Sequence, residues 1–251
     1  MIIGLIPARL ESRRLPNKPL IIIEKLPLVI HVYKRALLSK LLGRVIICGD
    51  DKKIGIVAKK YGCKFVLTSK NFRNGTERIA HVAKKMNCKL IIDLQCDNVF
   101  LNPNELDKLI KFHLKNQNFD IVVPYAEYKK KKDPSAVKVI STNKNKILTM
   151  SRADVPFSFN SKENFYQRHQ DFISFKKKAL LDYIDLPMTK NESIEGIELL
   201  RAIENGMNLG TLKVDSFKNI HSINNKNDLK LARKNIKFCK IKKKYYKNLE
   251  I

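Results

Sequence analysis

The first feature of this sequence that could do chemistry is a cluster of positive charge close to the amino terminus. Residues 6–20 read IPARLESRRLPNKPL and directly follow an apolar stretch. Four basic side chains lie there: Arg9, Arg13, Arg14 and Lys18. Fixed cations at this spacing can bind the oxygens of a polyphosphate.

Three prolines stiffen the same stretch, because each fixes its own φ and restricts the residue before it. They are Pro7, Pro16 and Pro19. A stiff cationic loop after the first strand of an α/β sheet suits a polyphosphate, and the alternative is a solvated basic turn. The stretch contains neither GxxxxGK[ST] nor GxGxxG, so it indicates neither a P-loop ATPase nor a dinucleotide-dependent dehydrogenase.

A second candidate segment is Asn74-Gly75-Thr76-Glu77-Arg78, which opens a predicted helix. Gly75 permits close backbone approach, and Thr76 can cap the helix. The free N–H groups of the first turn suit an anion or an acceptor-rich base. The alternative is a plain helix start with a capping acid.

A third segment, Gln95-Cys96-Asp97-Asn98, follows an apolar strand-like stretch. A carboxylate at the end of a strand, facing a phosphate-binding loop, is well placed to hold Mg²⁺. The alternative for Asp97 is an ordinary turn aspartate.

Two further groups suit a second, acidic substrate. Arg152 and the pair Arg168-His169 can bind a carboxylate and hydroxyls, although a lone histidine is often structural. A predicted helix carries side chains spaced three apart, which can either hydrogen-bond sugar hydroxyls or form a solvated face with i,i+3 pairs. These are Glu192, Glu195, Glu198 and Arg201.

Strand-like and helix-like stretches alternate through the first half and must position these groups. Strands are predicted at 2–6, 45–48, 64–67, 89–94 and 120–123. Helices are predicted at 28–38, 53–60, 76–86 and 104–114. This alternation indicates parallel βαβ units. We therefore predict an α/β fold, a three-layer α/β/α doubly wound, mostly parallel sheet with its ligand crevice at the carboxyl ends of the strands.

The second half is less regular. A hairpin is predicted from 136–140 and 146–150, followed by a polar and aromatic excursion at 157–167. Further predicted elements are a strand at 172–175, helices at 177–184 and 194–205, a strand at 210–214 and a final helix from about 227. The basic residues 237–251 are expected to form a loosely held tail.

Composition narrows the class of protein. The 251 residues allow a sizeable core, and no apolar run approaches the roughly 20 residues that cross a bilayer. With no signal peptide at the amino terminus, we expect a cytoplasmic protein. Five widely spaced cysteines predict neither a zinc site nor a disulfide framework. The net charge of +26 attracts acidic ligands, but the lysine runs are scattered and no nucleic-acid module is recognisable, so we expect no specific nucleic-acid binding.

Taken in order, these segments resemble the CMP-KDO synthetases, the cytidylyltransferases that activate 3-deoxy-manno-octulosonate (KDO). The resemblance runs over about residues 1–232. It is carried by IPARLESRRLPNKPL, GTERIA, QCDNV, AVKV after Ser135, SRADVP, Arg168-His169, ELLRAIE from Glu198 and INNKNDL. The first motif is specific to sugar-acid cytidylyltransferases.

The resemblance implies that the anomeric hydroxyl of KDO, or of a related 2-keto-3-deoxy sugar acid, attacks the α-phosphate of CTP at a Mg²⁺ site and releases pyrophosphate. It implies catalytic roles for Arg9, Lys18 and Asp97. CTP would contact Pro7, Ala8, Arg9, Arg14, Lys18, Asn74, Gly75, Thr76, Arg78, Gln95 and Cys96. The sugar acid would contact Gln95, Arg152, His169, Glu195 and Glu198. Asp97 and Asn224 would hold the metal.

The resemblance also implies the overall organisation. Residues 1–251 would form a single nucleotidyltransferase domain with the nucleotide-diphospho-sugar transferase fold. It would comprise a CTP-binding half at 1–125, a sugar-binding and dimerisation half at 126–236, and the tail. A homodimer and a role in lipopolysaccharide biosynthesis would follow.

The chain departs from the family pattern at six positions. Asn224 replaces the second metal-binding aspartate, Cys96 and Asp171 replace glycines, Asn98-Val99 replaces Glu-Pro, and Leu199 replaces a glutamine. An amide oxygen can ligate Mg²⁺ but supplies no charge. The alternatives are therefore a divergent homologue acting on another ulosonic acid, a catalytically weakened nucleotide-binding protein, or a basic binding protein on the same scaffold.

Overall fold

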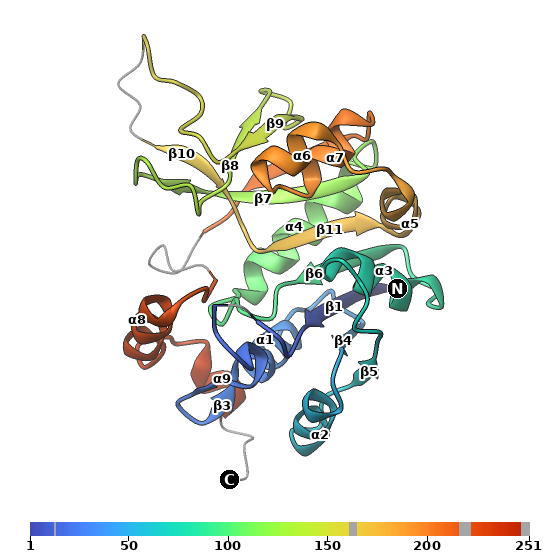
Figure 1. The fold of residues 1–251 in the computed structure, drawn as a ribbon, viewed down its shortest axis with the longest axis vertical. Helices are drawn as coiled ribbons and strands as arrows, with labels where there is room; N and C mark the ends of the chain where they lie inside the picture. The colour runs from blue at the N-terminus through green and yellow to red at the C-terminus, as the bar shows by residue number, and fades with distance from the viewer. Residues whose placement is uncertain (13, 161–164, 216–221, 247–251) are drawn as a thin grey trace. The chain divides into compact units, whose positions relative to one another are not determined.

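The computed structural model describes residues 1–12, 14–160, 165–215 and 222–246 (Figure 1). Arg13, which we predicted to be one of the loop cations, lies outside the described residues. The chain divides into two compact units, residues 1–107 with the segment from 216 onward, and residues 108–215. The C-terminal segment therefore belongs with the amino-terminal unit, and the assignment of 1–251 to a single domain stays a prediction.

The first unit contains a parallel sheet of four strands in the order β5-β4-β1-β6. The strands are β1 Ile2–Ala8, β4 Arg44–Gly49, β5 Phe65–Leu67 and β6 Leu90–Leu94. All four were predicted, and β1 runs two residues further than expected, so that Pro7 and Ala8 end the strand. Strands β1, β4 and β6 are buried on both faces, which explains why their sequences are mostly apolar, whereas the edge strand β5 is partly exposed.

Helices of this unit cover both faces of the sheet. They are α1 Leu28–Ala36, α2 Lys52–Lys60 and α3 Gly75–Lys84. The register pairs Pro7 with Cys48 and Ala8 with Gly49, so Pro7 and Gly49 face opposite sides. A Cβ at Gly75 of α3 would meet Pro7, whereas a Cβ at Gly49 would meet Ile54 of α2. Helices α2 and α3 therefore lie on opposite faces, as right-handed crossovers in opposite directions require.

The strand order reverses beside β1, because the chain runs outward through β4 and β5 and then returns to β6 on the other side. The carboxyl ends of β1 and β6 thus meet at a topological switch point, where open α/β sheets bind ligands.

The C-terminal segment buttresses the loop after β1. Helix α8, Lys226–Ile236, belongs to the same unit as the short elements η1 Lys18–Leu20, β2 Ile22–Ile23 and β3 Leu26–Pro27. An apolar cluster joins α8 to β2 and to the start of α1: Leu15, Ile23, Leu28, Val99, Phe100, Ile223, Ala232, Ile236 and Cys239. Because Leu15 is anchored there, its neighbours Arg14 and Lys18 are fixed near one another. Asn17 turns the chain between them with φ 54, a left-handed conformation that asparagine tolerates.

The prediction of a loosely held tail is wrong for residues 237–246. Helix α9, Lys242–Tyr246, follows a buried Cys239, and Tyr245 is only 5% exposed. Arg35 of α1 donates to Tyr245 Oη at 3.2 Å and to Cys239 Sγ at 3.1 Å. Apolar and hydrogen-bonded contacts hold this part of the tail, although its composition is basic.

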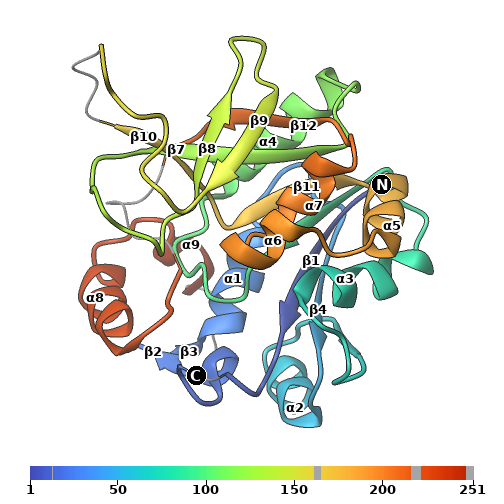
Figure 2. The same ribbon diagram turned by 45° about the horizontal axis from the view of Figure 1, so that its top comes forward.

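The second unit is built around β7, Ile121–Tyr128. Strands β10 Tyr166–His169 and β11 Phe172–Lys176 pair with it antiparallel, and β12 Leu209–Lys213 pairs with it parallel. The predicted hairpin is confirmed as β8 Lys138–Ser141 and β9 Ile147–Ser151, which lie side by side in Figure 2. Helix α4, Pro103–Lys115, leads into this unit, which also contains α5 Lys177–Asp185.

The predicted helix at 194–205 is wrong as a single helix. Helix α6 covers Lys190–Glu195 and ends at Gly196, whose φ of 60 is left-handed, and α7 covers Leu199–Glu204. The break means that the acidic side chains do not share one helix face. Glu192 and Arg201 instead form a buried two-pronged ion pair with distances of 2.6 and 2.8 Å. Among the described residues, no helix is long and apolar enough to pass through a bilayer.

Candidate active site

The loop after β1, the turn after β6 and the segment before α8 bring four predicted site residues together. The ammonium of Lys18 contacts Asp97 Oδ2 and lies 3.4 Å from Asn224 Oδ1. Arg14 Nη2 donates to the same Asn224 oxygen at 2.9 Å. Residues far apart in the sequence thus form one polar cluster at the switch point.

The orientation of Asn224 is set by its neighbours. Its Nδ2 donates to Ser222 Oγ at 2.8 Å, which turns Oδ1 towards the two cations. Its backbone N–H donates to Asp228 Oδ2 at 2.8 Å, and Asp228 also closes the capping box of α8. Asp228 is therefore a positioning residue for Asn224, and the sequence analysis did not single it out.

Arg9 leaves β1 and lines two cavities, of about 570 and 210 Å³. Its Nη2 donates to the carbonyl of Phe72, and its buried Nε has no hydrogen-bond partner in the described part of the chain. The guanidinium is thus held at one end and retains a donor for a ligand.

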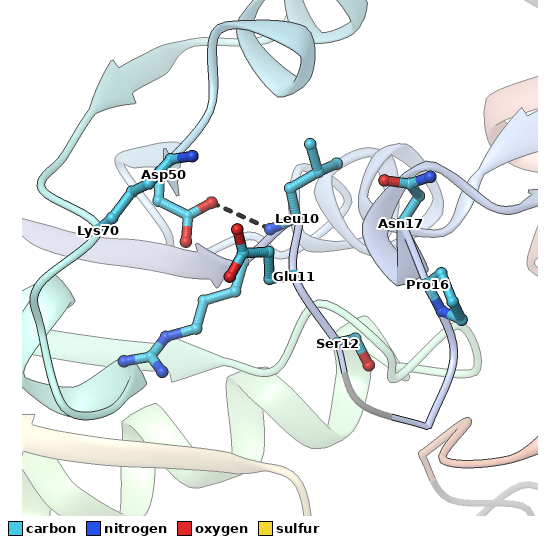
Figure 3. Close-up of a pocket in the computed structure, with 8 residues that line it drawn as sticks. Leu10, Glu11, Ser12, Pro16, Asn17, Asp50 and Lys70 are labelled. Carbon is cyan, nitrogen blue, oxygen red and sulfur yellow. Dashed lines mark hydrogen bonds between the residues drawn. The ribbon is translucent and has the colours of Figure 1, made fainter.

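The smaller cavity collects most of the predicted nucleotide residues. It is lined by Pro7, Arg9, Glu11, Ser12, Lys18, Pro19, Gly75, Gln95, Cys96 and Asp97. The larger one shares Arg9, Glu11 and Ser12 and adds Asp50 and Lys70 (Figure 3). Glu11 and Ser12 were missed as site residues, although their position between the loop cations was a usable signal.

The start of α3 was assigned correctly but capped by a different residue. Asn74 is the N-cap and accepts from the backbone N–H of Glu77 at 2.9 Å, whereas Thr76 lies inside the helix. A Cβ at Gly75 would meet the Pro7 ring at 3.1 Å. This close approach, which only glycine allows without movement, keeps α3 against the end of β1 beside the cavity.

Arg78 is completely buried, although a role in lining the base pocket was predicted. Its guanidinium donates to Ser69 O at 3.1 Å and to Asp50 Oδ2 at 3.2 Å, and it also contacts Thr68 Oγ1. Asp50 in turn accepts from the backbone N–H of Leu10 at 3.0 Å, as Figure 3 shows. The structure thus places Arg78 behind the site, where it positions Asp50 and the first turn of the loop.

Gln95 and Cys96 complete this part of the site. Gln95 Nε2 donates to Asp93 Oδ2 at 2.9 Å, which fixes its amide beside the smaller cavity. Burial raises the pKa of the Cys96 thiol to about 12, so this side chain is neutral at pH 7 and contributes bulk rather than charge.

Asp97 and Asn224 fit a hard divalent cation. Both present oxygens within reach of the same ammonium, and the buried Asp97 Oδ1 has no hydrogen-bond partner among the described residues. The described residues contain no group of three or more His, Cys, Asp and Glu side chains that could hold a metal. A Mg²⁺ ion would therefore take its other ligands from substrate phosphates and water.

The predicted sugar-binding residues Arg152, His169, Glu195 and Glu198 all lie in the second unit. Arg152 gives its guanidinium donors to three backbone carbonyls: Glu195 at 2.6 Å, Pro134 at 2.8 Å and Gly196 at 3.1 Å. Glu195 accepts from Ser151 Oγ at 2.6 Å and from the Arg152 N–H at 3.0 Å. These hydrogen bonds hold the pKa of Glu195 below its usual range.

His169 differs from these two residues. Its Nε2 is buried and has no hydrogen-bond partner in the described part of the chain. Burial, with help from the nearby Arg168 and Arg152, lowers the pKa of His169 to about 4, so the ring is neutral at pH 7. A neutral imidazole with one free nitrogen can hydrogen-bond a hydroxyl. Of Glu198, the backbone carbonyl accepts from Tyr183 Oη at 2.9 Å.

Lys138 was not predicted as a site residue. It is fully buried, and its ammonium donates to the carbonyls of Asp133 at 2.7 Å and Arg152 at 2.8 Å. Asp154 Oδ1 lies 3.4 Å from it. A lysine in an otherwise apolar strand was the available signal, and its contacts hold Arg152 in place.

Comparisons with known proteins agree with this arrangement. The chain matches the cytidylyltransferase family over residues 3–220. It is 35% identical over 218 residues to the 3-deoxy-manno-octulosonate cytidylyltransferase of Leptospira biflexa, covering 85% of this chain and 88% of the relative. It is 32% identical over 234 residues to the 8-amino-3,8-dideoxy-manno-octulosonate cytidylyltransferase of Shewanella putrefaciens, covering 88% and 96%.

A solved structure supports the fold. The structure of a CMP:2-keto-3-deoxy-manno-octonic acid synthetase complexed with CTP is similar, with a TM-score of 0.90 and 26% identity over 94% of this chain and 98% of that chain. This likeness confirms the predicted three-layer α/β/α class.

Proposed function

Because this chain belongs to the cytidylyltransferase family, we propose that it transfers CMP from CTP to the anomeric hydroxyl of 3-deoxy-manno-octulosonate and releases pyrophosphate. The observation that carries the proposal is the cluster in which Lys18, Arg14, Asp97 and Asn224 meet beside the cavity that Arg9 lines. Cations that bind phosphate and oxygens that bind a metal lie together there.

The loop residues supply charge where the reaction needs it. The sugar hydroxyl oxygen bonds to the α-phosphorus, the bond from that phosphorus to the bridging oxygen breaks, and the hydroxyl proton passes to solvent. Negative charge grows on the departing pyrophosphate. Arg9, Arg14 and Lys18 would neutralise this charge once the triphosphate is bound, and cations in place before the chemical step lower its barrier.

We assign Mg²⁺ to Asp97 and Asn224. When bound, the ion would neutralise phosphate charge and polarise the phosphorus centre. Asp97 provides the single carboxylate, and Asn224 provides a neutral oxygen that Ser222 and Asp228 keep aimed at the site.

The sugar acid is proposed to bind in the second unit, near His169 and the loop that Arg152 and Glu195 hold. Arg152 and Glu195 are engaged with the protein, so their role is to shape this loop, whereas His169 Nε2 is available for a hydroxyl.

A second candidate substrate is 8-amino-3,8-dideoxy-manno-octulosonate. Asp171, where the family pattern has glycine, adds a carboxylate two residues after His169. An amino group on the sugar is cationic at pH 7 and would favour a nearby carboxylate, and the Shewanella relative is named for this sugar.

We further propose a cytoplasmic homodimer that acts in lipopolysaccharide biosynthesis. Phe157 and Phe159, in the predicted excursion, are 82% and 85% exposed. Two such exposed phenylalanines, separated by one residue, are typical of an interaction surface. Replacing both with serine is expected to shift the mass measured by light scattering from dimer to monomer. A monomeric wild-type protein would contradict the assignment.

The test of the reaction is pyrophosphate release with CTP, Mg²⁺ and a panel of 2-keto-3-deoxy sugar acids. Release with KDO supports the first substrate, and release only with the amino sugar supports the second. Asp97→Asn is the matched control, since it keeps the side-chain shape and removes the carboxylate. No release with any acid, from a protein that CTP does not protect against heat, would refute the proposed function.

A further inference from the structure

The ammonium of Lys18 stands where a metal ion would have to bind. It contacts Asp97 Oδ2 and lies 3.4 Å from Asn224 Oδ1, the two oxygens assigned to Mg²⁺. The side chains of Lys18 and Asp97 are only 14% and 12% exposed, so solvent screens this pair weakly.

The hydrogen bonds around these oxygens leave little room for a second cation. Asn224 Oδ1 accepts from both Arg14 and Lys18, which occupies the two lone pairs of an amide oxygen. Asp97 Oδ2 is taken by Lys18, and only the buried Asp97 Oδ1 has no hydrogen-bond partner among the described residues. A metal can use the full set only after Lys18 has moved.

We propose that Lys18 closes the metal site in the nucleotide-free protein and that the triphosphate opens it by drawing Lys18 and Arg14 onto its own oxygens. This inference rests on the proposed function, because it takes Asp97 and Asn224 as the metal ligands. It assigns Lys18 two successive partners: first the carboxylate, then the phosphates.

The charge of the site explains why Lys18 can block metal binding in this chain. With asparagine at position 224, the two ligands carry one negative charge, which a single ammonium neutralises. A free divalent ion is therefore only weakly attracted to this site. A triphosphate brings several negative charges, attracts the two loop cations and uncovers Asp97 at the moment when its own oxygens complete the metal shell.

Binding of nucleotide then strengthens binding of the metal, and binding of the metal strengthens binding of nucleotide to the same extent. The effect of Lys18 is best measured as the metal affinity of the nucleotide-free protein, because CTP itself binds metal. Mn²⁺ is a suitable probe, since the electron paramagnetic resonance signal of the free ion reports binding directly and needs no turnover.

The decisive variant is Lys18→Met, which keeps the length of the side chain and removes its charge. We expect the wild-type protein to bind Mn²⁺ weakly and the variant to bind it about tenfold more tightly, within the usual range for coupled sites. The double variant Lys18→Met/Asp97→Asn should lose this gain, because it lacks the carboxylate that Lys18→Met exposes. Mn²⁺ bound to other acidic groups on the surface would be the same in the single and the double variant.

The matched control is Lys59→Met on α2. Lys59 is exposed and lines neither cavity, so its loss changes the net charge by the same amount without touching Asp97. Because free charges are screened within about 8 Å at physiological salt, the Mn²⁺ affinity of this control should equal that of the wild type.

Two further variants keep the test open if Lys18→Met does not fold. Arg14→Met removes the other donor to Asn224 and should tighten Mn²⁺ binding by a smaller factor. Asn224→Asp adds a charge that Lys18 alone cannot neutralise, and it should also tighten Mn²⁺ binding. Circular dichroism verifies folding of each variant.

Equal Mn²⁺ affinity of the wild-type protein and all folded variants would overturn the inference. This result is distinguishable from failure of the proposed function, which is read from pyrophosphate release and from protection by metal-free CTP. Transfer activity without any gain in Mn²⁺ binding refutes the role of Lys18 alone. Tighter Mn²⁺ binding in the variant of a protein that neither binds CTP nor releases pyrophosphate supports the role of Lys18 and refutes the proposed function.

Discussion

The two units use similar polar residues in different ways. In the first unit, Arg9 and Asp97 each keep a buried polar atom that has no partner in the described structure, and both line the same cavity. In the second unit, the Arg152 guanidinium donates to the backbone carbonyls of Glu195 and Pro134, and the Glu195 carboxylate accepts from the backbone N–H of Arg152. Among the predicted site residues, His169 of the second unit also keeps a polar atom without a partner in the described structure, whereas Arg152 and Glu195 hold their loop together.

The reason lies in the backbone around each group. The cations of the first unit lie on the loop that follows β1 at the switch point. Leu15 and Asp50 hold the backbone of this loop, so its charged side chains are not needed for that purpose. In the second unit, the side chains of Arg152 and Lys138 bind the backbone carbonyls of Gly196 and Arg152, respectively. There the predicted site residue Arg152 itself holds the backbone, whereas in the first unit Leu15 and Asp50 do so.

The largest effect is expected for Arg9→Met. If Arg9 faces the triphosphate, losing its charge should lower kcat about 100- to 1,000-fold, as for other preorganised charges. The thermal midpoint of the ligand-free protein should change little. Steady-state kinetics beside a thermal melt provide the measurement, and a stability loss with an unchanged kcat would place Arg9 among the structural groups.

Glu192→Gln should do the reverse. The Glu192–Arg201 pair is buried, with side chains 6% and 2% exposed, so removing one charge strands the other. The free energy of unfolding should fall by about 3 kcal/mol, the low end for a broken buried pair. Urea denaturation measures it, and Lys178→Met, which breaks an exposed pair with Asp182, is the control with almost no expected effect. A similar loss in both variants would contradict this reading.

A smaller, selective effect is expected for Glu195→Gln. Weakening its contacts with Ser151 and Arg152 should raise KM for the sugar acid about tenfold by misplacing the loop, while KM for CTP stays unchanged. Comparing the two KM values tests this directly. Equal changes in both would mean that the two units do not divide the substrates between them.

The mildest prediction concerns pH. His113 is 1% exposed, accepts from Ser174 Oγ at 2.6 Å and donates to the carbonyl of Phe119 at 3.2 Å. Burial lowers its pKa from 6.5 to about 4. The unfolded chain therefore takes up this proton at a higher pH than the folded chain does. The stability contributed by the neutral ring is fully present above pH 6.5 and is lost as the pH falls towards 4.

His113→Gln should flatten the fall in unfolding free energy over this pH range. His31, in the first unit, is also buried with its pKa lowered to about 4, so His31→Gln should remove a comparable part. Denaturation series at pH 4 to 7 measure both slopes. Unchanged slopes in both variants would show that these rings titrate alike in the folded and unfolded chains.

Much of the fold could be predicted because the alternation of apolar strands and amphipathic helices in the first half is strong. The helix break at Gly196 could not, since glycine inside a helical pattern is tolerated until tertiary contacts decide. The packed tail was missed because its apolar residues, such as Cys239 and Tyr245, are scattered among lysines. Only the partners in space, Arg35 and the neighbouring core, reveal their role.

The site shows the same limits. The motifs predicted Arg9, Lys18 and Asp97 as site residues, and the structure places all three around one cavity. Sequence could not show that Arg78 turns inward to Asp50, or that Lys18 contacts Asp97 and Asn224, because these contacts depend on which partner lies within reach. Residue types and their positions in the motifs predicted the chemistry of the site, whereas the direction of each side chain is known only from the packed structure.

The most direct test of the central claim is a crystal structure of the protein with CTP and Mg²⁺. We predict that Arg9, Arg14 and Lys18 contact the triphosphate, that Asp97 contacts the metal, and that Lys18 has left Asp97. A nucleotide bound elsewhere, with Lys18 still paired to Asp97, would contradict the account.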